Sequence, residues 1–141
     1  MKRPRNLMDG YYVLDGKSPR PVTDIMEWGQ AFEHSNRVVA LTQTDLYTVS
    51  TVFLGISHGQ LRNGPPHLFE TMVFTSAEYD GLVPSAESLN ATTCRYPSWD
   101  DAEAGHATQV RRLERQVEVL VSRKVEAATQ RQTSKAGHDG D

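Results

Sequence analysis

The segment after Pro97 constrains the fold most, because no proline interrupts the chain from Ser98 to its last residue. Ser98 is followed three residues later by Asp101, a spacing that resembles a capping box with aspartate in place of the usual glutamate. Asp100 and Asp101 also place negative charge at the positive end of the helix dipole. The pattern therefore predicts a long helix over 98–127, followed by a disordered tail over 129–141.

Along this predicted helix, side chains recur at alternating steps of four and three residues, which is a heptad seam. The seam consists of His106, Val110, Leu113, Val117, Leu120, Lys124 and Ala127. Two interpretations are open: the seam joins two copies of the chain as a coiled coil, or it packs along the sheet of its own domain. The first interpretation predicts a protein interface that includes Val110, Leu113, Val117, Leu120, Arg112 and Arg115.

Charge is distributed unevenly, although the formal net charge is only −3 and the pI is about 5.9. The body of the chain is acidic and the C-terminal segment is mildly basic. A nucleic-acid-binding domain usually carries a basic stripe and a high pI, so no nucleic-acid partner is expected. The basic side chains of the helix are typical of a solvated face, and they also suit an acidic protein partner. They are Arg111, Arg112, Arg115, Arg123 and Lys124.

Cys94 is the lone cysteine, so no internal disulfide forms, which favours a reducing compartment. The basic residues near the start are followed by no apolar h-region, and no apolar run approaches the roughly 18 residues of a membrane span. We therefore expect a cytoplasmic protein with no membrane partner. Zinc-ligand, Walker A and dinucleotide-binding patterns are absent from the sequence, so no metal and no cofactor are expected.

Before the long helix, short runs of β-branched and aromatic residues predict strands. Thr44–Asp45 is a short polar break suited to a hairpin, and the spacing of Ile25, Trp28 and Phe32 predicts a helix that packs on the sheet. The polar stretch 77–88 predicts irregular chain. The fold class is therefore α+β, with an antiparallel sheet of about four to five strands, one helix packed on it and the long C-terminal helix. The predicted strands are 11–14, 37–43, 46–56, 68–74 and 89–96.

The length of 141 residues matches one domain of about 100–150 residues. We expect a mobile arm over 1–10, a single domain over 11–128 that includes the long helix, and the tail over 129–141.

Glu70 is the one chemically unusual residue, because its predicted strand places it on the same face as apolar Leu68 and Met72. One interpretation is catalytic, with Glu70 acting beside His58 and His106. The other is structural, with the carboxylate paired with an arginine or guarding an edge strand. The second interpretation is favoured.

Gly64, Pro65 and Pro66 stiffen the end of a loop directly before this strand. Such a loop surface suits binding, and it equally suits protection of the strand entrance from unwanted pairing.

Three stretches together resemble a family of small proteins encoded by bacteriophages, notably those of actinobacteria, and by related prophages. They are STVFLG at 50–55, GPPHLFETMVF at 64–74 and YPSWDDAEAGH at 96–106. The resemblance covers most of residues 11–110. It implies a phage or prophage origin and a compact module, and it implies no particular reaction. The departures lie at 77–93 and after Val110, where we expect recognition of a member-specific partner.

The leading hypothesis is an accessory phage protein that binds a host or defence protein without catalysis. One alternative is a small hydrolase-like enzyme that uses Glu70 with His58 or His106. The other alternative is an oligomerising component of a phage assembly, in which the C-terminal helix joins copies as a homodimer.

Overall fold

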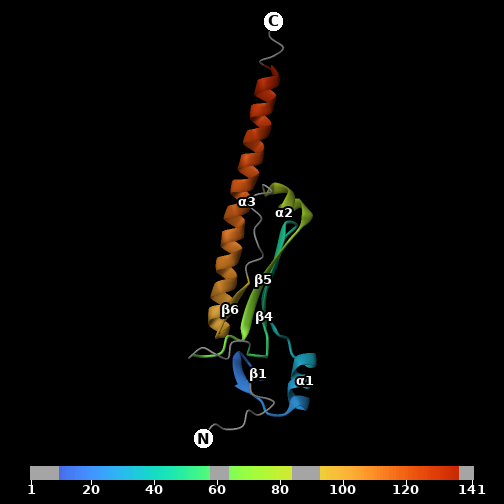
Figure 1. The fold of residues 1–141 in the computed structure, drawn as a ribbon, viewed down its shortest axis with the longest axis vertical. Coiled ribbons are helices and arrows are strands. Elements are labelled where there is room, and N and C mark those ends of the chain that lie inside the picture. Colours follow the sequence, from blue (N-terminus) through green and yellow to red (C-terminus); the bar gives the residue numbers. More distant parts are fainter. Residues whose placement is uncertain (1–9, 58–63, 84–92, 137–141) are drawn as a thin grey trace.

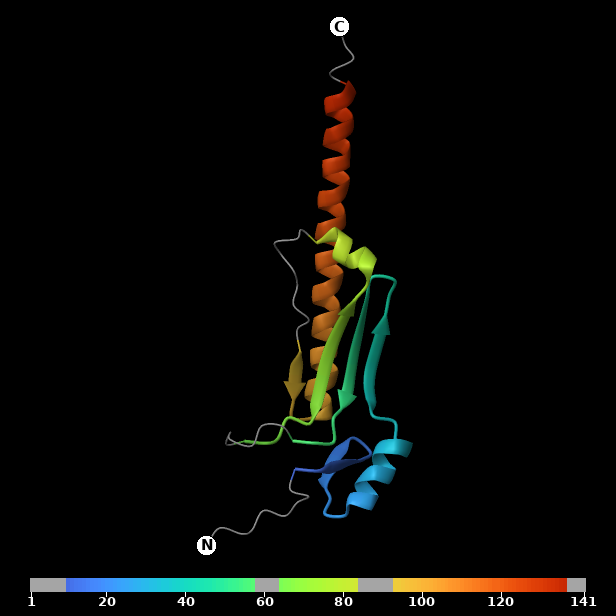
Figure 2. The same ribbon diagram turned by 45° about the vertical axis from the view of Figure 1, so that its right-hand side comes forward.

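A computed structural model describes residues 10–57, 64–83 and 93–136 of the chain (Figure 1). A four-stranded antiparallel sheet lies along a long C-terminal helix, and a two-stranded hairpin with a short helix lies at one end of the sheet (Figure 2). These elements confirm the predicted α+β class.

The large sheet has the strand order β3-β4-β5-β6, and each neighbouring pair is antiparallel. Its strands are β3 (Val38–Gln43), β4 (Tyr47–Phe53), β5 (Phe69–Thr75) and β6 (Cys94–Tyr96). Thr44 closes the β3–β4 hairpin, because its Oγ1 accepts a hydrogen bond from the Tyr47 N–H at 3.0 Å. The hairpin predicted at Thr44–Asp45 is thereby confirmed.

The two faces of this sheet differ in burial because side chains alternate along each strand. On β4, Tyr47, Val49, Thr51 and Phe53 are buried, whereas Thr48, Ser50 and Val52 are only half-buried. We call the first set's side the covered face and the second set's side the open face. The open face also carries exposed Leu41, Met72 and Phe74 from the neighbouring strands.

The covered face packs against α3 (Trp99–Ala136), a helix of 38 residues that contacts all four strands. Ser98 caps it as predicted, since its Oγ accepts a hydrogen bond from the Asp101 N–H at 3.1 Å. The helix continues well past the end of the sheet (Figure 1). Residues 129–136, for which the sequence predicts a disordered tail, are therefore helical.

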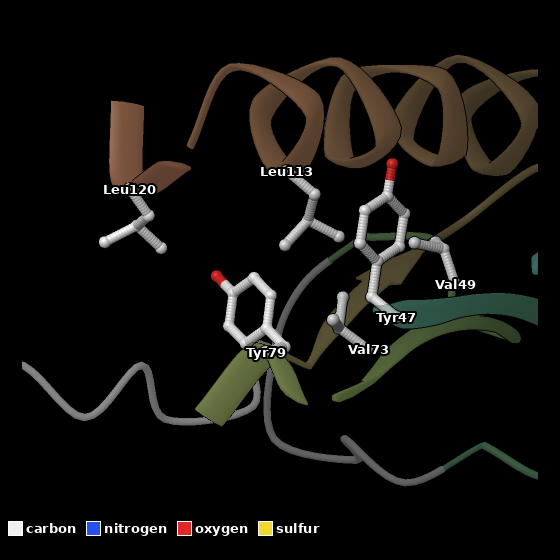
Figure 3. Close-up of a cluster of buried hydrophobic side chains, with 6 residues drawn as sticks. All are labelled: Tyr47, Val49, Val73, Tyr79, Leu113 and Leu120. Atoms are coloured by element: carbon white, nitrogen blue, oxygen red, sulfur yellow. The ribbon is translucent and has the colours of Figure 1, made fainter. Parts of the chain in front are cut away.

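Two clusters of buried side chains join α3 to the sheet. The larger cluster consists of Tyr47, Val49, Val73, Tyr79, Leu113 and Leu120 (Figure 3). The smaller consists of Phe53, Leu68, Phe69 and Ala102. Figure 3 shows Leu113 and Leu120 pointing from α3 towards the sheet and a short helix, α2 (Ala77–Leu82).

This helix, α2 (Ala77–Leu82), lies where the sequence predicts irregular chain, so that prediction is wrong for these residues. Ser76 caps it, its buried residue is Tyr79, which is 1% exposed, and half-buried Leu82 packs against the same cluster. Burial raises the pKa of Tyr79. The predicted strand 89–96 is confirmed only at its end, in β6, because residues 84–92 lie outside the described ranges.

The small unit at the end of the sheet consists of β1 (Tyr12–Asp15), β2 (Ser18–Pro21) and α1 (Ile25–His34). The helix α1 packs on this hairpin rather than on the large sheet, and Ile25 is 62% exposed, contrary to prediction. Trp28 ties the unit to the chain that directly follows β4, because its Nε1–H donates to the Gly55 carbonyl at 3.1 Å.

Candidate functional site

A buried polar network between α3 and the covered face surrounds His106, one of the predicted catalytic residues. The imidazole Nε2 lies 2.8 Å from the Thr42 Oγ1 of β3, and Nδ1 lies 2.8 Å from the Thr51 Oγ1 of β4. The Thr51 hydroxyl in turn lies 2.6 Å from the Thr71 hydroxyl of β5. The network therefore links α3 to three adjacent strands.

Both ring nitrogens of His106 have a hydroxyl partner, and a hydroxyl can either donate or accept. The neutral imidazole is therefore satisfied in either tautomer. Burial lowers the pKa of His106, since the charged form would lose hydration. These contacts assign His106 a structural role in holding α3 against the sheet.

The fourth strand contributes Cys94, whose sulfur accepts a hydrogen bond from the Gln109 amide at 3.4 Å. Next to it, the Tyr96 ring lies so close to Gly105 that a Cβ at this position would collide with the ring. Gly105 and His106 thus have different packing functions. Gly105 leaves room for the Tyr96 ring of β6, and His106 forms the hydrogen bonds of the polar network.

Glu70 lies on the other side of the sheet, because it precedes Thr71 in the same strand and side chains alternate. Its carboxylate accepts a hydrogen bond from the Arg95 Nε of β6 at 2.9 Å, and only 12% of its side chain is exposed. The structure therefore shows the favoured interpretation, a carboxylate paired with an arginine.

The predicted catalytic residues do not form one site within the described part of the chain. Glu70 lies on the open face and His106 on the covered face, so the sheet separates them. His58 lies outside the described residues. In the described ranges, no group of three or more His, Cys, Asp or Glu side chains is arranged to hold a metal ion.

Of the predicted loop surface, Gly64 and Pro65 are exposed and Pro66 is half-buried. Gly64 has a φ of 140°, a conformation that favours glycine. These residues form no described contact with Glu70 or His106.

The predicted interface residues fall into two groups. Leu113 and Leu120 are each 5% exposed and belong to the core of their own chain, and Val110 and Val117 pack against the same cluster. Their seam is therefore occupied by the sheet, which is the second of the two interpretations. Arg112 and Arg115 remain on the exposed surface of α3.

Beyond Leu120, α3 carries an exposed surface that the heptad seam does not include. We call residues 121–136 the projecting segment; its residues 121–135 are all exposed. Val121, Val125 and Ala128 follow one another at steps of four and three, so they share one side of the helix. This stripe is displaced from the seam positions Lys124 and Ala127. The same steps of four and three, started from Val121 rather than from Leu120, find it.

None of the helices in the described residues combines the length and apolar character needed to cross a membrane. The chain matches no family model, no curated protein and no solved structure.

Proposed function

We propose that the protein is a non-catalytic accessory factor, of the phage-encoded type that its sequence resembles, which binds a host or defence protein through the projecting segment of α3. The observation that carries this proposal is the continuation of α3 from Val121 to Ala136 with every described side chain exposed.

A helical segment of this length gains little stability by itself, because most helical stability in proteins comes from packing of an apolar face. The projecting segment also contains Val121, Val125 and Thr129, whose β-branched side chains lower helix propensity. A partner that covers the valines would supply the missing packing. Val121 and Val125 are 43% and 59% exposed, so each has area to lose on binding.

Charge specifies the partner further. The projecting segment carries Arg123, Lys124, Arg131 and Lys135, opposed only by Glu126. An apolar groove with an acidic rim on the partner would be complementary to this helix in shape and in charge, as in other helix-in-groove complexes. Glu70 and His106, the two predicted catalytic residues that the structure describes, are both engaged in structural contacts, which agrees with a binding role.

The test is affinity capture from a lysate of an actinobacterial host, with the full-length chain immobilised. Val121→Glu combined with Val125→Glu should abolish retention of a host protein that the wild-type chain retains. Val119→Glu is the matched control, because Val119 is 48% exposed on the same helix but lies two residues from Val121 and so faces elsewhere. Retention that survives the double substitution, or a wild-type chain that retains no host protein, contradicts the proposal.

A further inference from the structure

The two edges of the large sheet are protected very differently. At one edge, β6 has only three residues, and one of them is charged Arg95. At the other edge, β3 has six residues, Val-Val-Ala-Leu-Thr-Gln, with neither a charge nor a proline. Short length, charge, proline and β-bulges are the usual devices that prevent an edge strand from pairing with another chain, and from Ala40 to Gln43 β3 has no charge, no proline and no register shift.

The hydrogen bonds of the β3–β4 hairpin identify the backbone groups of β3 that point away from the sheet. The Thr44 N–H donates to the Tyr47 carbonyl at 2.8 Å, so the backbone groups of Thr44 point towards β4. Alternate residues of an antiparallel edge strand face outward, which directs the N–H and C=O groups of Leu41 and Gln43 to the free edge. No hydrogen bond to these outward groups occurs among the described residues.

No described element lies along this edge. Figure 2 shows β3 as the outermost strand of the sheet, while α3 lies across the covered face. Leu41, on the open face of β3, is 53% exposed. The edge therefore offers unpaired backbone groups beside an exposed apolar side chain.

We propose that β3 pairs antiparallel with β3 of a second copy of the chain, about a twofold axis at Thr42, so that the two sheets become one. A register shift between Val38 and Ala40 interrupts the first part of the strand, so the regular part begins at Ala40. Centring on Thr42 places Leu41 of each copy opposite Gln43 of the other. All outward groups of these two residues are then paired.

A second copy of the chain fits the free edge of β3 in charge as well as in geometry. Self-pairing of a charged strand would place like charges opposite each other, whereas pairing of uncharged β3 places none. The twofold axis runs perpendicular to the sheet, so both α3 helices lie on the same side and both open faces remain continuous. The contact is isologous and closed, as in most homodimers.

The contact is short, so the dimer should be weak. An edge of this length buries much less than the roughly 1,200 Å² of a standard stable interface. Association should therefore rise with protein concentration rather than be complete at low concentration. This assembly is independent of the proposed partner of the projecting segment, because β3 and residues 121–136 are separate surfaces.

Sedimentation velocity of the full-length chain over a concentration series tests the proposal. Leu41→Pro removes an outward N–H without removing a bond to β4, and proline is tolerated at such edge positions. Loss of two of the four backbone bonds between copies should raise the dissociation constant about tenfold or more. Leu41→Lys, which places like charges beside each other, is a second variant with the same expected result.

Two controls separate the edge from other surfaces. Met72→Lys places a charge on the open face in the interior strand β5, and Val121→Glu with Val125→Glu alters the projecting segment. Both should still dimerise. A wild-type chain that stays monomeric throughout the series overturns the proposal, as does dimerisation that Met72→Lys or the α3 variant abolishes while the Leu41 variants retain it.

Discussion

The Nδ1 atom of His106 on α3 lies 2.8 Å from the Oγ1 atom of Thr51 on β4, and that hydroxyl also lies 2.6 Å from the Thr71 hydroxyl on β5. Thr51 is therefore the shared member of the network between helix and sheet. It is completely buried, so water does not replace a lost hydroxyl there without repacking.

Thr51→Val retains the shape of this side chain and removes its hydroxyl, which leaves the Nδ1 atom of buried His106 without its partner and takes one hydrogen bond from the Thr71 hydroxyl. The expected loss in the free energy of unfolding is about 1–3 kcal/mol, measured by urea denaturation. Thr48→Val is the control on the open face of the same strand and should change stability by less than about 0.5 kcal/mol. Equal effects of the two substitutions would contradict the structural role of the network.

Stability should depend on pH through His106. Burial lowers its pKa below the ordinary value of 6.5, so the unfolded chain binds a proton that the folded chain does not. The free energy of unfolding should therefore fall as the pH is lowered from about 6.5 towards the folded-state pKa, and level off below it. His106→Gln should remove this dependence, whereas His34→Gln, at an exposed site, should retain it. Denaturation curves between about pH 5 and 8 give the comparison.

The sequence predicts the strands of this sheet well because their signal is local. Periodicity and turn residues place β3, β4 and the hairpin at Thr44 without knowledge of the rest of the fold. The partners of His106 are different, since Thr42 and Thr51 lie 64 and 55 residues away along the chain. Which strand residues face a distant helix depends on strand order and register, which local patterns do not encode.

Gly105→Ala should destabilise the protein, although alanine is the better helix former by about 1 kcal/mol. The added Cβ would meet the ring of Tyr96, and such overpacking typically costs about 1–3 kcal/mol. Gly29→Ala in α1 is the matched control, because nothing lies within 4 Å of the Cβ built there. It should raise stability by about 0.5–1 kcal/mol. Thermal unfolding of both variants distinguishes a required glycine from an incidental one.

The ion pair between Glu70 and Arg95 should show an asymmetric response to mutation. Arg95→Leu leaves a largely buried carboxylate without its partner, whereas Glu70→Gln leaves an arginine whose side chain is 42% exposed and can reach water. We expect a loss of about 2 kcal/mol for the first and about 1 kcal/mol or less for the second, by urea denaturation. A larger loss for Glu70→Gln would mean that the carboxylate has a role beyond this pair.

The sequence predicts that the heptad seam is buried, but it does not determine which surface buries it. Leu113 and Leu120 need burial, and a coiled-coil partner or the chain's own sheet satisfies that need equally well. The choice depends on the covered face offering Tyr47, Val49 and Val73 at the right height along α3. The predicted end of the helix at residue 127 is also too early, because polar composition after this residue does not exclude a helix that grows from a packed one.

Side-chain truncation to alanine at successive positions of α3 should therefore show where the core ends. Leu113→Ala and Leu120→Ala should each lower the free energy of unfolding by about 2–5 kcal/mol, because each leaves a cavity beside buried neighbours. Val125→Ala, five residues beyond the core residue Leu120 and 59% exposed, should change it by less than about 0.5 kcal/mol. Urea denaturation measured at several protein concentrations completes the test. If the leucines serve a coiled coil between copies, their effect should vary with protein concentration, whereas packing on the chain's own sheet makes it independent of concentration.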